Sequence, residues 1–227
     1  MKDFKKGHRF RMMEKYLNNS NCSTKEILEI ILYLCIPRKD TKEIANLLLE
    51  KFHNSIFHIC SASSEELMEI EGLGQNSIIF LKLIKDIAIR FTLERLEKKS
   101  ILKNFNDLVE YCRLNIGGKK QEEFHVIFLD AKNQIIKDEI IFFGTLSSVK
   151  IYPREIIKKC LDYCASKIIF VHNHPSGDPT PSSEDITVTK NLFQVLSMVN
   201  ISLYDHIIVG STSFISFLQN KIPPFNN

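Results

Sequence analysis

The spacing of apolar residues changes partway along this chain of 227 residues, and that change constrains the fold more than any other feature. From Ser23 to about Arg90, apolar residues recur at the spacing of a helix that is buried on one side. Beyond about residue 118 they form short runs rich in Val, Ile and Phe, which are typical of buried strands. We therefore expect an α+β protein, with a small helical domain at residues 1–95 and a mixed sheet flanked by helices at residues 104–227.

Local signals support both halves. Ser23 with Glu26, and Ser63 with Glu66, have the spacing of capping boxes at helix starts. The charged stretch Glu94–Lys99 has no wide apolar face and is expected to link the two domains. In the second half, helices are expected over 106–114, from 153 onward and over 184–198. Five strands are expected between or after these helices: Phe124–Leu129, Gln134–Phe143, Lys167–Val171, Ile201–Val209 and Ser213–Phe217.

Composition excludes several classes of protein. With 44% hydrophobic and 25% charged residues, the chain is ordinary globular protein rather than a disordered segment. Its six cysteines form no CxxC pair and are expected to be reduced thiols. The basic start lacks the apolar stretch of a signal peptide, and no apolar run is long enough to cross a membrane. We expect a soluble cytoplasmic protein.

The segment from Val171 to Asp185 is the strongest candidate for chemistry. His172 and His174 are two residues apart, so in an extended segment both rings point to the same side, as two ligands of one metal must. Asp185 could complete a set that leaves a fourth position open for water. Two alternatives remain open: two histidines at this spacing also occur by chance, and Ser182 with Asp185 has the spacing of a cap that needs no metal.

These residues also carry a resemblance to known families. His172-x-His174-Pro175, six further residues, Ser182, two residues and Asp185 resemble the JAMM signature of MPN-domain metalloproteases. Motifs across nearly the whole chain resemble the RadC family: Gly7-His-Arg9, Ile36-Pro-Arg38, Glu139 with Gly144-Thr145, Tyr152-Pro-Arg-Glu155, His172-Asn-His-Pro-Ser-Gly177 and Asp205-His-Ile-Ile-Val-Gly210. The resemblance implies that residues 104–227 form an MPN domain, a fold of the JAB and cytidine-deaminase-like type.

The resemblance further implies a role for each matching residue. His172, His174 and Asp185 would hold Zn²⁺, although other divalent ions also bind imidazole and carboxylate. Glu139 would be the general base, and Ser182 would stabilise the oxyanion. The implied activity is hydrolysis of a peptide or isopeptide bond in a protein or peptide substrate. One departure is Asn173, since many JAMM enzymes have Ser or Thr between the two histidines.

Other residues compete for these roles. Asp138 and Glu155 are alternatives to Glu139 as the base, although Asp138 is expected on the opposite face of the sheet from Glu139. Two further pairs have both a functional and a structural interpretation: Asp205-His206, as support for a ligand or as a hydrogen-bonded core pair, and Cys160 with Cys164, as metal ligands or as packing residues.

A rival function is DNA association with a non-catalytic MPN domain. Ile70-Glu-Gly-Leu-Gly74 resembles the hairpin of a helix-hairpin-helix motif, whose backbone NH groups can receive a phosphate oxygen. RadC members have carried a DNA-repair label, but Glu69 and Glu71 beside the turn would repel phosphate. The net charge of +3 comes from the first part of the chain, where Lys2, Lys5, Lys6, Arg9, Arg11 and Lys15 cluster. A third hypothesis is a scaffold whose site is closed by a partner or by the chain itself.

Overall fold

A computed structural model describes residues 7–18, 21–37, 39–97, 99–144 and 151–226. The chain divides into two units, residues 1–87 and 88–227. Lys2, Lys5 and Lys6 of the predicted basic cluster lie outside the described residues, as do Arg38 and Thr145 of the RadC-like motifs. Every helix within the described ranges is too short or too polar to cross a membrane.

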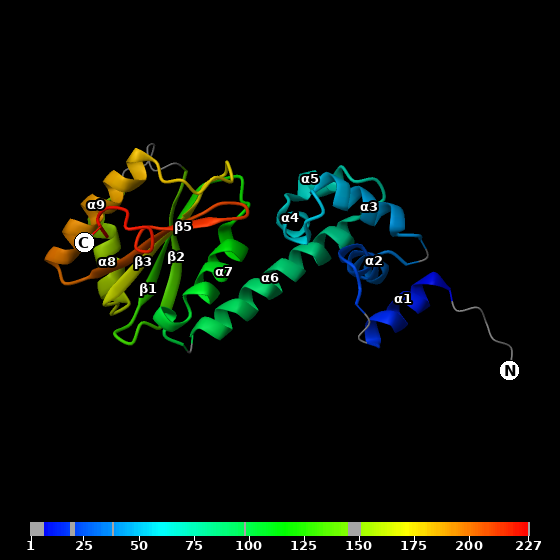
Figure 1. Cartoon of the computed structure of the whole chain (residues 1–227), viewed down its shortest axis with the longest axis horizontal. Helices are drawn as coiled ribbons and strands as arrows, with labels where there is room; N and C mark the ends of the chain where they lie inside the picture. The colour runs from blue at the N-terminus through cyan, green and yellow to red at the C-terminus, as the bar shows by residue number, and fades with distance from the viewer. Residues whose placement is uncertain (1–6, 19–20, 38, 98, 145–150, 227) are drawn as a thin grey trace. The chain divides into compact units, whose positions relative to one another are not determined.

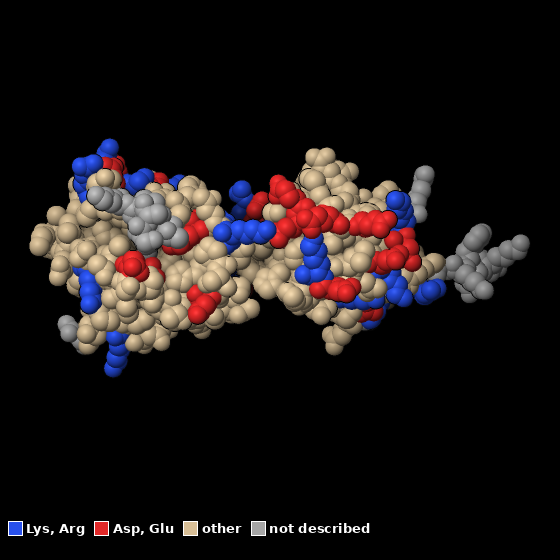
Figure 2. Space-filling model, turned by 90° about the horizontal axis from the view of Figure 1, so that it is seen from above, with Lys and Arg blue, Asp and Glu red and all other residues tan. Residues whose placement is uncertain are grey.

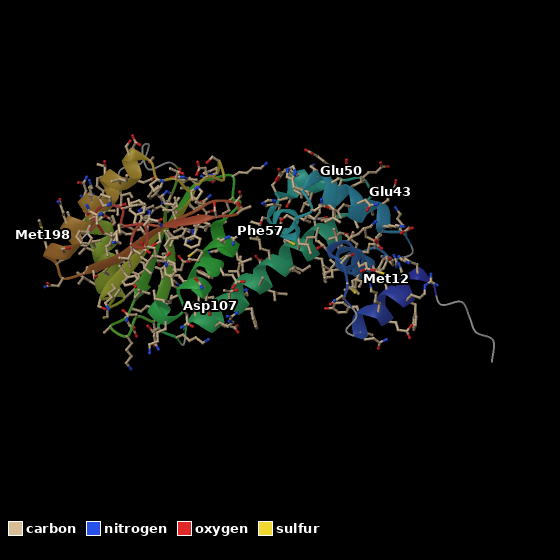
Figure 3. All side chains as sticks on the ribbon, viewed as in Figure 1. Met12, Glu43, Glu50, Phe57, Asp107 and Met198 are labelled. Atoms are coloured by element: carbon tan, nitrogen blue, oxygen red, sulfur yellow. The ribbon has the colours of Figure 1, made fainter. Side chains whose placement is uncertain are left out.

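The N-terminal unit is helical, as predicted. Its core consists of side chains that recur at helical spacing, including the fully buried Leu28, Leu32, Leu48 and Leu67. Met12 is the side chain that α1 buries, and Figure 3 shows it beside α2. The helices are α1 (His8–Leu17), α2 (Thr24–Cys35), α3 (Lys42–Lys51), α4 (Ile56–Ser61), α5 (Ser64–Met68) and the first part of α6 (Gln75–Glu97).

Both predicted capping boxes are confirmed. At the starts of α2 and α5, the serine side chain accepts from the backbone NH three residues on, and the glutamate accepts from the serine backbone NH. The predicted linker is wrong, because Glu94 to Glu97 are the last residues of α6. Glu, Arg and Leu are good helix formers, and Leu96 is fully buried with Ile101 in the core of the C-terminal unit.

The C-terminal unit has a five-stranded mixed sheet, and all five predicted strands are confirmed to within a few residues. The strand order is β2-β1-β3-β4-β5, in which only β3 and β4 are parallel neighbours. A parallel pair needs a crossover, and α9 supplies it. The elements are η1 (Ile101–Lys103), α7 (Phe105–Ile116), β1 (Glu123–Leu129), β2 (Ile135–Phe143), α8 (Pro153–Asp162), β3 (Lys167–Asn173), α9 (Ser183–Met198), β4 (Ser202–Val209) and β5 (Phe214–Ser216).

Helices cover both faces of this sheet (Figure 1). Phe124, Val126 and Phe170 point to the face covered by α8 and α9. Ile127 and Val171 point to the other face, where α7 packs. Because β1 and β3 are buried on both faces, their sequences are continuous apolar runs rather than alternating ones.

Candidate metal centre

Two histidines and one aspartate meet at the carboxyl end of β3. His172 is in β3, His174 follows it directly, and Asp185 lies in the first turn of α9. The Nε2 atoms of the two histidines are 3.0 Å apart, and they lie 3.3 Å and 3.4 Å from the two carboxylate oxygens of Asp185. Among the described residues, this is the group of His, Cys, Asp and Glu side chains that could hold a metal ion, with all ligand atoms within 4.8 Å of one another.

The separations fit a tetrahedral zinc site. With ligand distances of roughly 2.0–2.1 Å, the edges of a zinc tetrahedron are about 3.3 Å long. The histidine and aspartate donor set is also one that zinc binds, and three protein ligands leave a fourth position open. The residues present therefore fit the metal.

A chain of hydrogen bonds sets which nitrogen of His172 faces the site. The Thr189 hydroxyl has one proton and donates it to the Asp185 carbonyl oxygen at 2.5 Å. It must then accept from His206 Nδ1, at 2.7 Å. His206 Nε2 is consequently an acceptor for His172 Nδ1, at 2.8 Å, and the lone pair of His172 Nε2 points into the site. Complete burial lowers the pKa of both His172 and His206, which favours these neutral forms.

His174 is oriented in the same way by a different partner. Its Nδ1 donates to the backbone carbonyl oxygen of Asp178 at 2.8 Å, so its Nε2 also faces the site. Burial alone would raise the pKa of Asp185, but hydrogen bonds with His172 and His174 hold it well below its usual value. Hydrogen bonding to Asp185 raises the pKa of His174. A buried carboxylate therefore lies beside two imidazoles, and these three side chains can bind either protons or a metal cation.

Ser182 caps α9, which is the structural role that its spacing with Asp185 predicts. Its hydroxyl oxygen accepts from the Asp185 backbone NH at 3.1 Å, and Asp185 Oδ2 accepts from the Ser182 backbone NH at 2.7 Å. This capping box fixes Asp185 toward the histidines. Ser182 is exposed at the site, and its hydroxyl proton is not used by the cap, which takes only a lone pair.

Two glycines allow the histidine loop to pack closely against the end of β4. A Cβ on Gly210 would lie 2.2 Å from the carbonyl oxygen of Gly177, which no side chain can accommodate without moving the loop. Gly177 itself has φ of +86°, a conformation that favours glycine. These contacts explain why both motifs of the RadC resemblance have glycine at these positions.

Glu139 is not brought to the histidines. Its carboxylate accepts from Lys159 Nζ at 2.6 Å and from the Tyr163 hydroxyl, so α8 engages both of its oxygens. Burial raises the pKa of Glu139, but these two bonds outweigh it and lower the pKa overall. Glu139 is on β2, and β1 separates that strand from β3. The structure therefore holds the Glu139 carboxylate against α8 and away from the histidines, and the sequence-based assignment of Glu139 as the base stays a prediction.

Glu122 lies where Glu139 was expected. It directly precedes β1, it is buried, and its charge contributes to the raised pKa of His174. Side chains alternate along extended backbone, so Glu122 shares a face with Phe124, whose ring stacks near that of His172 at a centroid distance of 6.0 Å. In the sequence, Glu122 is marked only by its place directly before β1, and the pairing of β1 with β3 explains what that place means.

The remaining candidates lie elsewhere. Asp138 faces α7, opposite Glu139, as predicted, and Glu155 is exposed on α8. Asp205 accepts from Ser216 Oγ and from the Leu218 backbone NH, away from the site, whereas its neighbour His206 bonds to His172. Cys160 is buried and Cys164 is exposed, so packing rather than a shared metal accounts for the buried one.

The structure supports a prediction about the hydrogen-bond chain. Thr189→Val removes the acceptor of His206 Nδ1, which favours the tautomer that puts a proton on the metal-facing nitrogen of His172. We expect zinc affinity to fall about 10- to 100-fold, as is typical for partners of metal ligands. The matched control is Thr187→Val on the same helix, whose hydroxyl makes the equivalent bond to the Ser183 carbonyl but does not contact a histidine. Equal zinc affinities for the two variants, measured by competition with a zinc chelator, would contradict the role of these hydrogen bonds in orienting His172.

A second buried polar cluster lies on the face of α7. His125 is between two carboxylates, with Nδ1 2.9 Å from Asp138 Oδ1 and Nε2 3.1 Å from Glu123 Oε2. Tyr111 and Asn115 donate to the other oxygen of Asp138 at 2.6 Å and 3.2 Å. Burial lowers the pKa of His125, but the two carboxylates more than compensate, and the pKa is raised overall.

This raised pKa predicts a dependence of stability on pH. The stabilisation from His125 is fully present below its unfolded pKa, near 6.5, and is lost as pH rises through the higher folded value. We expect His125→Gln to lower the free energy of unfolding by roughly 1–3 kcal/mol at pH 6, and by less at pH 9. Thermal or urea unfolding of both proteins across this range measures the difference. A difference that stays constant or grows with pH would refute the prediction.

The comparisons with known proteins agree with this architecture. A family model described as RadC-like JAB domain matches residues 102–222. The UPF0758 protein FN0909 of Fusobacterium nucleatum subsp. nucleatum is 41% identical over 225 residues, which cover 95% of this chain and 97% of that protein. The UPF0758 protein SPO0054 of Ruegeria pomeroyi is 36% identical over 219 residues, covering 96% of this chain and 97% of that protein.

The C-terminal unit is thus a JAB domain of the MPN superfamily, with a histidine and aspartate cluster at the end of its central strands. The chain as a whole belongs to the RadC family.

Proposed function

We propose that this protein is a zinc-dependent hydrolase of the JAMM type that cleaves a peptide or isopeptide bond. The observation that carries the proposal is the convergence of His172, His174 and Asp185 at the spacing of a tetrahedral site. The membership of the RadC family and the JAB domain supports it. When bound there, zinc would supply Lewis acidity and lower the pKa of a water toward about 7.

The chain's own residues have separate roles in this proposal. Glu122 is the general base in place of Glu139: its carboxylate accepts a proton from the attacking water and passes it to the leaving nitrogen. Ser182 donates its hydroxyl proton to the oxyanion that forms on the substrate carbonyl. The two histidines and Asp185 hold their positions through the hydrogen bonds described above, so the site is preorganised.

The test is a search for cleavage by the zinc-loaded protein. A panel of unmodified peptides and of isopeptide-linked peptides is incubated with the wild type and with His174→Ala, and products are identified by mass spectrometry. The proposal expects cleavage at one or more amide bonds by the wild type alone. Wild-type protein that binds zinc yet cleaves no member of either class would count against hydrolysis and favour a scaffold with a closed site.

The expected cytoplasmic location stays a prediction.

The rival function, DNA contact through the Gly72–Gly74 hairpin, has less support. Gly72 does turn the chain into α6 with φ of +83°, but Glu69 and Glu71 beside it are exposed. Glu43 and Glu50 lie on the same unit (Figure 3). Figure 2 shows acidic side chains gathered across the N-terminal unit on the face it draws. Such a surface repels phosphate.

The basic residues of the N-terminal segment are partly engaged within the protein. Arg9 Nη2 donates to the carbonyl oxygens of Ile36 and Lys39, at 2.6 Å and 2.5 Å, and Lys15 pairs with Glu26. Binding to a duplex that weakens steeply with salt and survives His174→Ala would nevertheless favour the rival.

A further inference from the structure

Asn173, the residue between the two histidines, bonds to a single short segment of the chain. Its side chain is buried, and its Oδ1 accepts from the Glu123 backbone NH at 2.8 Å. Its Nδ2 donates to the carbonyl oxygens of Lys119 and Gln121, both at 3.1 Å. All three partners are backbone groups between α7 and the start of β1, 50 to 54 residues away in sequence.

Two further backbone bonds hold this segment, from the Lys119 NH to the Ile116 carbonyl oxygen and from the Gly144 NH to the Glu122 carbonyl oxygen. Residues 117–122 lie between α7 and β1, and the register of β1 with β3 begins at Phe124 opposite His172. Beyond that pair the sheet provides no ladder bond from β3 to the Glu123 NH. The Asn173 side chain takes the place of a backbone partner from β3. Its amide oxygen accepts from the Glu123 NH, and its amide nitrogen donates to the two carbonyl oxygens.

Glu122 lies within the segment that the Asn173 side chain binds. It lies between Gln121 and Glu123, whose backbone groups Asn173 binds on either side. The side chain of Glu123 is committed to the opposite face of the sheet, where it contacts Lys119 and His125. Holding the backbone in this alternating conformation therefore directs Glu122 toward the face of His172 and His174.

We propose that Asn173 is a positioning residue that holds the carboxylate of Glu122 at the metal centre by fixing the backbone on both sides of it. This inference rests on the proposed function. It also gives a physical reason for an asparagine at this position: a serine is too short to reach three backbone groups, and an aspartate cannot donate to two carbonyl oxygens. No change at Asn173 removes a metal ligand.

The first measurement needs no substrate and no metal. In the metal-free wild type, hydrogen exchange of the Glu123 amide is expected to be slow, like that of a strand amide, because its NH is buried and bonded. In Asn173→Ala it is expected to be at least about 10-fold faster. A Glu123 amide that exchanges in the wild type as fast as an exposed one overturns the inference, whether or not the variant folds.

The second measurement separates positioning from a structural role. Cobalt(II) replaces zinc, and the pH midpoint of its visible spectrum is recorded for the wild type, Glu122→Gln, Asn173→Ala and the double variant. Asn173→Ala is expected to retain cobalt and to shift the midpoint toward that of Glu122→Gln, with no further shift in the double variant. Asn173→Ser, which is uncharged and too short to reach the three backbone groups, serves if Asn173→Ala does not fold.

Asn115→Ala is the matched control, since this asparagine also bonds inside the C-terminal unit but to Asp138 and Tyr111. It is expected to leave the cobalt midpoint unchanged. If the Asn173 variants have the midpoint of the wild type, or if the two shifts add in the double variant, the inference about Asn173 is overturned. The proposed function is then unaffected. A wild type that takes up no cobalt overturns the proposed function together with this inference.

Discussion

Asp185→Asn is expected to reduce bound zinc from about one ion per chain to nearly none after dialysis. Asp185 is the one anionic member of the three-residue set, it is 2% exposed, and both of its oxygens face a histidine Nε2. An amide of the same size can still accept from the Ser182 backbone NH, so the cap of α9 is largely retained. The loss therefore reports the charge rather than unfolding.

The chain offers a matched control for this experiment. Glu66 is at the same position of the capping box of α5, so Glu66→Gln makes the same acid-to-amide change at a helix start outside the three-residue set. It is expected to retain the zinc of the wild type. Elemental analysis of both proteins, each shown to be folded by circular dichroism, makes the comparison. Zinc retained by folded Asp185→Asn would remove the basis of the metal site.

Glu122→Gln is expected to lower kcat about 10²- to 10⁴-fold, whereas Glu139→Gln is expected to change it by less than about threefold. The first substitution removes the proposed proton acceptor, a buried carboxylate whose charge acts on His174. The second alters a carboxylate that Lys159 and Tyr163 hold against α8. Both proteins should retain zinc, because neither residue is in the ligand set.

The measurement is kcat and KM for a bond that the wild type cleaves in the peptide panel. The two glutamates control for each other, since the same chemical change is made at a buried position by the site and at a position two strands away. Loss of activity in Glu139→Gln with normal activity in Glu122→Gln would support the sequence-based assignment of Glu139 as the general base. Equal losses would mean that neither carboxylate alone accepts the proton.

The grouping of His172, His174 and Asp185 could be predicted from sequence because its geometry is local. Two residues of one strand separated by one position always share a face, and a residue at the third position of a capped helix always points back toward the helix start. These two rules and one short loop bring the three side chains together, whereas their role as metal ligands is what the resemblance to the JAMM signature implies. The order of elements was predicted from apolar spacing for the same reason.

The predicted linker failed for a different reason. A charged stretch without a wide apolar face predicts a break between helices. Here, however, its residues have high helix propensity and continue α6. One side chain of the stretch, Leu96, is fully buried in the core and holds this end of the helix in place. One apolar residue in six is too weak a pattern to recognise before the packing is known.

The two kinds of secondary structure, the capping boxes and the grouping of His172, His174 and Asp185 could be predicted from sequence, because all of them depend on neighbours within a few positions. Which glutamate lies near these three residues depends on tertiary structure. Glu122 and Glu139 are both acidic residues at β-rich segments, and their distances from His172 depend on the strand order β2-β1-β3 and on the register that pairs Phe124 with His172. Strand order and register arise from contacts between residues some 50 positions apart, such as the bond from Glu123 to Asn173, which no local pattern encodes.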